Sequence, residues 1–169
     1  YVDIRVSFNS FLPDKMSDEL AEKLVNYYLA ELEQNNNYHD KVEFEIIFSC
    51  YTFDIQKRMS KLLGHGFAQE ELDTLQNDLK ELTNTIIDKE NGLSRKDLDV
   101  LKELQRRQKR ILASDLNEIE KIYWLMEDCK KYGSLPFAGL ARAGFVAVQL
   151  LKSMVTEELI SEDDYQNFM

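Results

Sequence analysis

The sequence predicts an α+β fold that is predominantly α-helical, with an N-terminal strand-helix-strand unit followed by a helical bundle that includes a long helical hairpin. Two segments within the first 50 residues alternate apolar and polar side chains, as half-buried strands do. After residue 53, leucines recur at spacings of three and four, which is typical of helices. Glycine and proline are scarce, with 6 and 2 residues, so long irregular linkers are not expected.

The length favours one domain, residues 1–169, because domains usually contain about 100–200 residues. Residues 1–52 are expected to form the strand-helix-strand unit, and residues 53–169 the helical part with its hairpin at 68–112. The chain starts without Met and inside an alternating pattern. We therefore expect it to be a fragment of a larger protein.

The first predicted strand covers residues 2–9 and the second covers residues 42–49. The inward positions would be Val2, Ile4, Val6 and Phe8 in the first strand, and Val42, Phe44, Ile46 and Phe48 in the second. Between them, Ser17 is a favourable N-cap for a helix that ends near residues 34–37. Parallel strands in a right-handed βαβ unit are the natural arrangement. Since two strands alone make a poor sheet, either missing residues complete it or the strands pack on the helices.

Caps and glycines delimit the later helices. A helix over 54–63 is expected to stop at Gly64, and one over 68–87 carries a leucine seam. A capping box of Ser94 and Asp97 would start the next helix, which would pair with 68–87 across a turn at Gly92.

Four residues are expected to mark the remaining helix ends. Ser114 would cap a helix that Gly133 ends, and Pro136 would open the next helix in its first turn. Ser161 would cap a last helix through Phe168.

The net charge of -10, from 31 acidic and 21 basic residues, argues against nucleic-acid binding, which needs clustered cations. Cys50 and Cys129 lie far apart and there is no signal peptide, so we expect a cytoplasmic protein with reduced thiols. His39 and His65 lack the spacing of metal ligands, so no metal is assigned. Glycine-rich phosphate loops and nucleophile elbows are absent, so no catalytic residue is assigned.

Residues 135–151 form an apolar, small-sided segment whose single charge is Arg142. A membrane span needs about 20 apolar residues with basic and aromatic flanks, so we expect a buried core helix and no membrane contact. A buried guanidinium needs a partner. We favour an internal ion pair with Glu43 or Glu45, and an anionic ligand is the alternative.

A second polar group of side chains flanks the two predicted strands. Its candidate binding residues, besides Arg142, are Arg5, Asn9, Ser10, Glu45 and Ser49. If the strands are parallel, their carboxyl ends bring together Asn9, Ser10, Ser49 and Cys50, at the edge where α/β sheets bind ligands. The alternative, which we favour, is a set of cross-strand salt bridges.

Four segments resemble the central region of large bacterial phosphoenolpyruvate synthase-like proteins with a PEP/pyruvate-binding domain. They are YVDIRVSFNSFLP, LAEKLVNYYL, HDKVEFEIIFSCYTFD and GSLPFAGLARAGFVAVQLLKS. The resemblance implies a parent that uses ATP and Mg, in which an ATP-grasp domain binds nucleotide and a mobile domain carries a phosphohistidine. Neither part is recognisable in this chain, and the phosphohistidine role is assigned to neither His39 nor His65.

Two functions therefore remain open. In the first, the chain is a non-autonomous domain of a PEP synthase-like phosphotransferase that shapes the acceptor site or bridges the nucleotide and mobile domains. Its partners would be other domains of the same polypeptide and a small-molecule acceptor. In the second, it is a helical interaction or scaffolding module without catalytic activity, which predicts exposed leucines along the hairpin.

Overall fold

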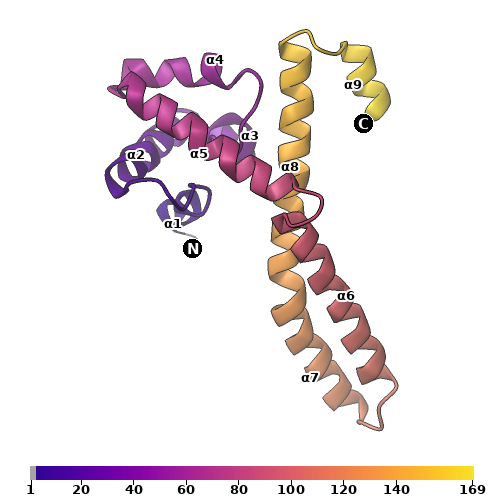
Figure 1. Ribbon diagram of the computed structural model, residues 1–169. Helices are drawn as coiled ribbons and strands as arrows, with labels where there is room; N and C mark the ends of the chain where they lie inside the picture. The colour runs from indigo at the N-terminus through magenta and orange to yellow at the C-terminus, as the bar shows by residue number, and fades with distance from the viewer. Residues whose placement is uncertain (1–2) are drawn as a thin grey trace. The chain divides into compact units, whose positions relative to one another are not determined.

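A computed structural model describes residues 3–169, and this part of the chain is 75% helical and contains no β-strand (Figure 1). The helices are α1 (Ile4–Asn9), α2 (Asp18–Gln34), α3 (Val42–Glu45), α4 (Ile55–Met59), α5 (Gln69–Ile87), α6 (Leu93–Leu112), α7 (Glu118–Asp128), α8 (Ser134–Thr156) and α9 (Glu162–Phe168). Short 3-10 helices cover Asn36–Tyr38 and Ser60–His65, and a π-helical turn covers Cys129–Gly133. The chain divides into two compact units, one formed by the residues up to Thr83 together with Val146–Met169, the other by Asn84–Phe145.

The predicted α+β class is wrong, because both segments expected to be strands adopt other conformations. The first forms α1, whose N-cap is Asp3: its carboxylate accepts hydrogen bonds from the backbone N–H groups of Arg5 and Val6. Only one expected inward side chain, Phe8, is buried there, and Val6 is 63% exposed. A local cap by Asp3 thus stabilises a helical turn in a segment whose alternation alone predicts a strand. Val2 lies outside the described residues.

The second predicted strand is also wrong, and it is replaced by α3 and an irregular buried segment. Ile46, Ile47 and Phe48 follow α3 and are all buried, so neighbouring side chains do not alternate between core and solvent. The backbone N–H of Phe48 donates to the hydroxyl of Tyr28 at 3.0 Å. Side chains, and not a neighbouring strand, therefore satisfy part of this buried backbone.

The core of the first unit lies between α2, the irregular segment and α5. It includes Phe8, Leu24, Val25, Tyr28, Ile47, Ile55, Met59, Leu62, Leu75 and Leu79. The predicted N-cap of α2 is confirmed, since Ser17 Oγ accepts from the N–H of Leu20 at 3.3 Å. Burial of Tyr28 raises the pKa of its hydroxyl, so this group stays a neutral hydrogen-bond partner in the core.

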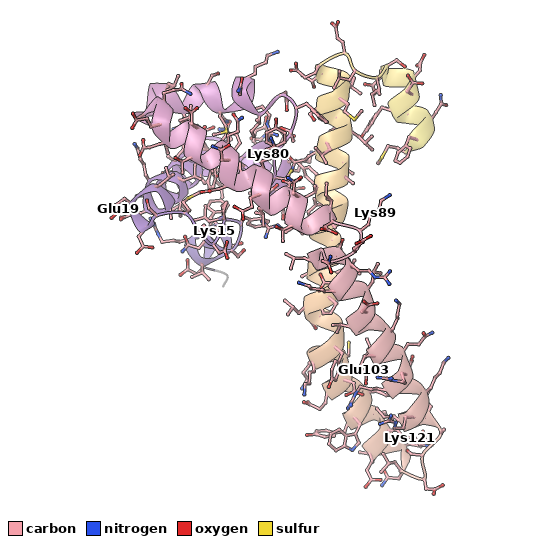
Figure 2. All side chains as sticks on the ribbon, viewed as in Figure 1. Lys15, Glu19, Lys80, Lys89, Glu103 and Lys121 are labelled. Carbon is pink, nitrogen blue, oxygen red and sulfur yellow. The ribbon has the colours of Figure 1, made fainter. Side chains whose placement is uncertain are left out.

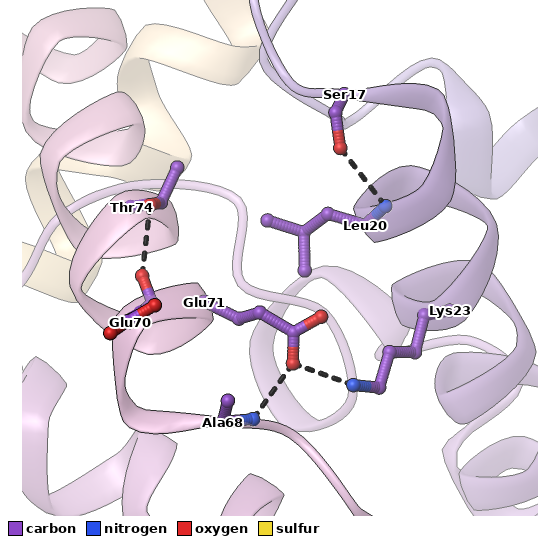
Figure 3. A network of polar contacts seen from close by, with 7 residues as sticks. All are labelled: Ser17, Leu20, Lys23, Ala68, Glu70, Glu71 and Thr74. Atoms are coloured by element: carbon purple, nitrogen blue, oxygen red, sulfur yellow. Dashed lines mark hydrogen bonds and ion pairs between the residues drawn. The ribbon is translucent and has the colours of Figure 1, made fainter.

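A polar clamp joins α2 to the start of α5 (Figure 3). The Glu71 carboxylate accepts from the backbone N–H of Ala68 at 2.7 Å and from Lys23 Nζ at 2.6 Å. One side chain thus caps the first turn of α5 and ties it to α2.

The 3-10 helix that continues α4 ends at Gly66, and not at Gly64 as expected. The φ of Gly66 is 84°, a left-handed conformation that favours glycine.

The second unit contains a helical hairpin formed by α6 and α7, whereas the sequence predicted a hairpin over 68–112. Figure 2 labels Glu103 on α6 and Lys121 on α7. The N-cap of α6 is Gly92, and a Cβ there would lie 2.3 Å from the carbonyl oxygen of Asp88. Ser94 is therefore not the expected cap; its hydroxyl donates to the carbonyl of Ile86.

The start of α7 also differs from the prediction. Asn117 and Glu120 form the capping box, since the Asn117 side chain accepts from the N–H of Glu120 and the Glu120 carboxylate accepts from the N–H of Asn117. Ser114, the expected cap, donates its hydroxyl to the carbonyl of Ile111. The reciprocal pair satisfies two backbone donors, which a single serine would not.

Gly133 does not end a helix. The π-helical turn carries the backbone from α7 into α8, and the N–H of Ser134 donates to the carbonyl of Cys129. Pro136 accordingly lies within a longer helix. Among residues 3–169, one continuous helix, Glu118–Thr156, is long and apolar enough to cross a membrane by its length and composition. The final predicted cap is confirmed, because Ser161 and Asp164 form a capping box at α9.

Candidate functional site

Two adjoining pockets of the first unit share Phe44, Glu45 and Arg58, and we call them together the Arg58 hollow. The larger pocket, about 340 Å³, is lined by Phe44, Glu45, Ile46, Phe48, Lys57, Arg58 and Lys61. The smaller, about 150 Å³, is lined by Phe44, Glu45, Asp54, Arg58, Gln149, Lys152, Ser153 and Thr156. Residues from α3, α4, the 3-10 helix after it and α8 thus line one concave surface.

Of the four cations of the Arg58 hollow, Arg58, Lys61 and Lys152 lie close to aromatic rings. The four are Lys57, Arg58, Lys61 and Lys152. The guanidinium carbon of Arg58 lies 5.7 Å from the ring centroid of Phe48, and Lys61 Nζ lies 5.8 Å from it. Lys152 Nζ lies 5.7 Å from the ring of Phe44. These distances are within the range of cation–π attraction, which stabilises the positions of these cations next to the aromatic rings of the hollow.

The Arg58 side chain is positioned by a buried hydrogen-bond network. Its Nη1 donates to Thr52 Oγ1 and to Gln149 Oε1, both at 3.3 Å. Gln149 Nε2 in turn donates to Ser49 Oγ and to the carbonyl oxygen of Glu43, both at 2.9 Å. Within residues 3–169 both of these Arg58 bonds involve Nη1, so the donors of Nε and Nη2 can bind an anion. A guanidinium fixed in this way loses little further freedom when it does.

The charge of the hollow is opposite to that of its surroundings. The first unit carries 9 Lys and Arg residues against 21 Asp and Glu residues, and four of those nine cations line the hollow. Two carboxylates, Glu45 and Asp54, also line it, and Asp54 accepts a hydrogen bond of 2.7 Å from Thr52 Oγ1. Cations that outnumber carboxylates in a concave surface attract anions by local field.

Two of the predicted site residues belong to this region. Glu45 lines both pockets, and Ser49 lies beneath them, where its buried hydroxyl accepts from Gln149. The structure brings them together through α3 and the irregular segment, and not through neighbouring strand ends.

The residues predicted from the first segment lie elsewhere, on the exposed surface around α1. Arg5 Nη2 donates to Asn26 Oδ1 at 2.7 Å. Ser10 is the C-cap of α1 and donates its hydroxyl to the carbonyl of Ser7, and Asn9 is the exposed last residue of the helix. None of the three predicted residues, Arg5, Asn9 or Ser10, lines the Arg58 hollow.

Arg142 is half-buried on α8 within the second unit. Its expected partners, Glu43 and Glu45, belong to the first unit. The ion pair and the ligand contact both stay predictions.

The cations of the hollow and the glutamine that positions Arg58 were not predicted from the sequence. Lys57 and Lys61 are four residues apart, and Gln149 and Lys152 are three apart, so each pair shares a helix face. The second pair lies in an otherwise apolar segment, where a lone Gln would have been a signal of a buried polar contact. No local signal connects the two pairs, which are about 90 residues apart in the sequence.

Among the described residues, 3–169, no group of three or more His, Cys, Asp or Glu side chains is placed to hold a metal ion. His65 instead packs edge-on against Tyr27, with ring centroids 4.9 Å apart. We assign no metal-ligating role to these residues.

Comparisons with family models, curated proteins and solved structures find no match to this chain. The resemblance to phosphoenolpyruvate synthase-like proteins therefore stays a prediction from the four quoted segments. The function is inferred from the Arg58 hollow.

Proposed function

We propose that this chain is a non-catalytic, ligand-positioning domain of a phosphoenolpyruvate synthase-like phosphotransferase, and that the Arg58 hollow binds an anionic group of a small-molecule acceptor. The observation that carries the proposal is the gathering of four cations, one of them fixed by Gln149, in a concave surface of a strongly acidic unit.

The chemistry of the hollow suits a carboxylate or phosphate. Arg58 offers planar N–H donors that match two oxygens of such a group, and the lysines add point charges around it. Phe44 and Phe48 give the hollow an apolar side that can contact the carbon skeleton of a ligand. A phosphoryl acceptor bound in this way would be oriented by this domain, and other domains of the polypeptide would supply the reacting groups.

The parent protein would supply ATP and Mg at its nucleotide-binding domain, and we place the whole protein in the cytoplasm. No step of the phosphoryl transfer is assigned to residues of this chain. Its contribution is orientation and electrostatic attraction of the acceptor.

The proposal is tested by titrating the isotope-labelled chain with inorganic phosphate and with pyruvate while following backbone amide NMR signals. We expect saturable shifts at residues 44–61 and 149–156. Replacing Lys57 and Lys152 together with Gln should weaken binding about tenfold, since each lost charge contributes about 0.5–1 kcal/mol near a protein surface. Both side chains are exposed, so the fold should persist.

A matched control is Lys89→Gln, which removes an exposed cation in the second unit (Figure 2). It should leave the affinity for phosphate unchanged. Shifts spread over the whole surface, or equal weakening by the control and the double variant, would refute a site at the hollow.

A second candidate function, a helical interaction module, is favoured by a different observation. Of the leucines predicted to be exposed, Leu72, Leu75 and Leu79 are buried and Leu98 is exposed. Instead, a run of exposed apolar side chains lies on α7, among them Ile119, Ile122 and Met126. This candidate is tested by whether substitutions on that helix change association of the protein and leave phosphate binding intact.

A further inference from the structure

The outer face of α7 carries exposed apolar side chains. Ile119 is 81% exposed, and Ile122, Tyr123 and Met126 are 58%, 57% and 59% exposed. Their spacings of three and four place them along one face of the helix. We call these four residues the α7 stripe. Side chains of this size, contiguous and open to solvent, mark a contact surface more often than a solvated one.

The α7 stripe lies opposite the face that α7 turns toward α6. Asp128 is 3% exposed, and both of its carboxylate oxygens accept hydrogen bonds of 2.9 Å from Arg107 Nε of α6. Leu125, three residues earlier, is half-buried on the same side. The inner face of α7 therefore packs on α6 through apolar side chains and an ion pair, while the outer face is also apolar. Packing within the hairpin does not account for the apolar outer face.

Charged side chains lie at both ends of the same helix, and Lys121 and Glu127 lie between them. Glu118 and Glu120 lie at the N-terminal end of the stripe, and Lys130 and Lys131 lie just beyond its C-terminal end. Two pairs of residues at equal distances from Trp124 carry opposite charges, Glu118 with Lys130 and Lys121 with Glu127, so at these positions the helix is complementary to its own antiparallel copy. An antiparallel pair centred at Trp124 would bring Glu118 opposite Lys130 of the partner subunit and Ile122 opposite Met126 of the partner subunit.

We propose that two copies of this chain associate through the α7 stripe, with their α7 helices antiparallel across a two-fold axis. Such an interface is isologous, so each apolar contact and each charge pair occurs twice. The two hairpins would then form a four-helix arrangement in which both faces of α7 are covered. The proposal rests on α7 alone and is independent of anion binding at the Arg58 hollow.

At present Lys130 forms a surface pair with Glu127, and Lys121, whose side chain is 19% exposed, lies 4.0 Å from the exposed carboxylate of Glu118. Exposed pairs of this kind contribute little, so exchanging them for pairs across the two-fold axis costs little. The net gain of association comes from covering the α7 stripe.

The test is sedimentation velocity of the whole chain over a range of concentrations. We expect a monomer–dimer equilibrium, and Ile122→Glu should raise the dissociation constant at least about 100-fold by placing two carboxylates at the centre of the interface. Leu159→Glu, which changes an equally exposed apolar side chain in the first unit, should not alter it. Circular dichroism checks that each variant keeps its helices.

The antiparallel register is tested by charge reversal. Glu118→Lys should weaken the dimer about tenfold, because the like-charged contact occurs twice, and adding Lys130→Glu should restore it. A chain that stays monomeric at all concentrations would overturn the proposal, as would a dimer unaffected by Ile122→Glu. Binding of a monomer to vesicles of phosphatidylserine and phosphatidylcholine through the stripe would assign it to a lipid surface instead and would also overturn the proposal. None of these variants touches the Arg58 hollow, so phosphate binding should be retained throughout.

Discussion

Gln149 donates a hydrogen bond of 2.9 Å to the hydroxyl of Ser49, 100 residues earlier in the sequence, and both side chains are buried. The same amide nitrogen donates to the carbonyl of Glu43, and the amide oxygen accepts from Arg58. One side chain thus holds the irregular segment, α3 and the main cation of the Arg58 hollow. A loss of this amide would affect both the fold and the site.

Gln149→Leu should destabilise the protein by about 3 kcal/mol, because it leaves a buried hydroxyl, a carbonyl and an Arg donor without this partner while nearly conserving volume. Urea unfolding measures the change. Gln105→Leu on α6 is the control, since its side chain is exposed, and it should change stability by less than about 0.5 kcal/mol. Equal effects of the two variants would contradict a structural role for the buried network.

The helix ends predicted correctly from the sequence are those set by local hydrogen bonds. The side chains of Ser17 and Ser161 each accept a hydrogen bond from the backbone N–H three residues later. Donor and acceptor are thus close in the sequence, and the local pattern is enough to predict the cap. Ser94 and Ser114 have the same local appearance but donate to earlier carbonyls, because Gly92 and Asn117 take the cap positions. Competing caps within a few residues are not distinguished by pattern alone.

The two strand predictions failed for different reasons: a local cap by Asp3 starts a helix in the first segment, and tertiary contacts determine the conformation of the second. At Phe48, the backbone donor is satisfied by the Tyr28 hydroxyl, which lies 20 residues away, and no strand pairing is needed. The site was predicted only in part, because tertiary contacts also bring its residues together. Glu45 and Ser49 lie near Arg58 in the sequence, whereas Lys152 is far from it in the sequence and is brought to the hollow only by the packing of α8.

Glu71 should contribute stability that depends on pH. Its hydrogen bonds from Lys23 and from the N–H of Ala68 lower the pKa of its carboxyl in the folded protein below the ordinary value (Figure 3). A depressed pKa means that the stabilisation is fully present above the unfolded-state pKa and is lost as pH falls through the folded-state pKa. Glu71→Gln should therefore cost about 1 kcal/mol near pH 7 and almost nothing near pH 2.

Urea unfolding of Glu71→Gln and of the native protein across this pH range measures that difference. Glu70→Gln is the matched control, because it removes an exposed carboxylate from the same first turn. The hydrogen bond from the Thr74 hydroxyl to Glu70 is accepted by the backbone carbonyl, so the substitution leaves it in place. A pH-independent effect of Glu71→Gln would show that the clamp does not act through the carboxylate charge.

Two glycines of α8 should respond in opposite ways to alanine. A Cβ on Gly144 would have no heavy atom within 4 Å, so Gly144→Ala should stabilise the helix by about 0.5–1 kcal/mol. A Cβ on Gly139 would lie 1.9 Å from Asp97 Oδ2 and 2.9 Å from its Cγ. Asp97 would have to move, so Gly139→Ala should destabilise the protein by about 1 kcal/mol despite the better helix propensity. Thermal unfolding compares the two variants, and stabilisation by both would mean that Asp97 does not pack on Gly139.

The ion pair between Arg107 and Asp128 should be the most important polar contact of the second unit. Arg107 Nε and Nη2 engage the buried Asp128 carboxylate, and the Arg107 guanidinium carbon lies 4.9 Å from the ring centroid of Tyr132. Asp128→Ala removes the carboxylate and leaves the Arg107 guanidinium without this partner. We expect a loss of about 1.5–2 kcal/mol, less than for a fully buried pair, because the Arg107 side chain is 32% exposed and can reach solvent.

The adjacent residue gives the control for this pair. Glu127 pairs with Lys130 on the surface, so Glu127→Ala should cost less than about 0.5 kcal/mol. Native-state hydrogen exchange of α6 and α7 measures both variants, because opening of the hairpin exposes its backbone amides. Asp128→Ala should accelerate exchange along both helices by about 10- to 30-fold, the factor that corresponds to about 1.5–2 kcal/mol. Similar exchange rates in the two variants would mean that apolar contacts alone hold the hairpin together.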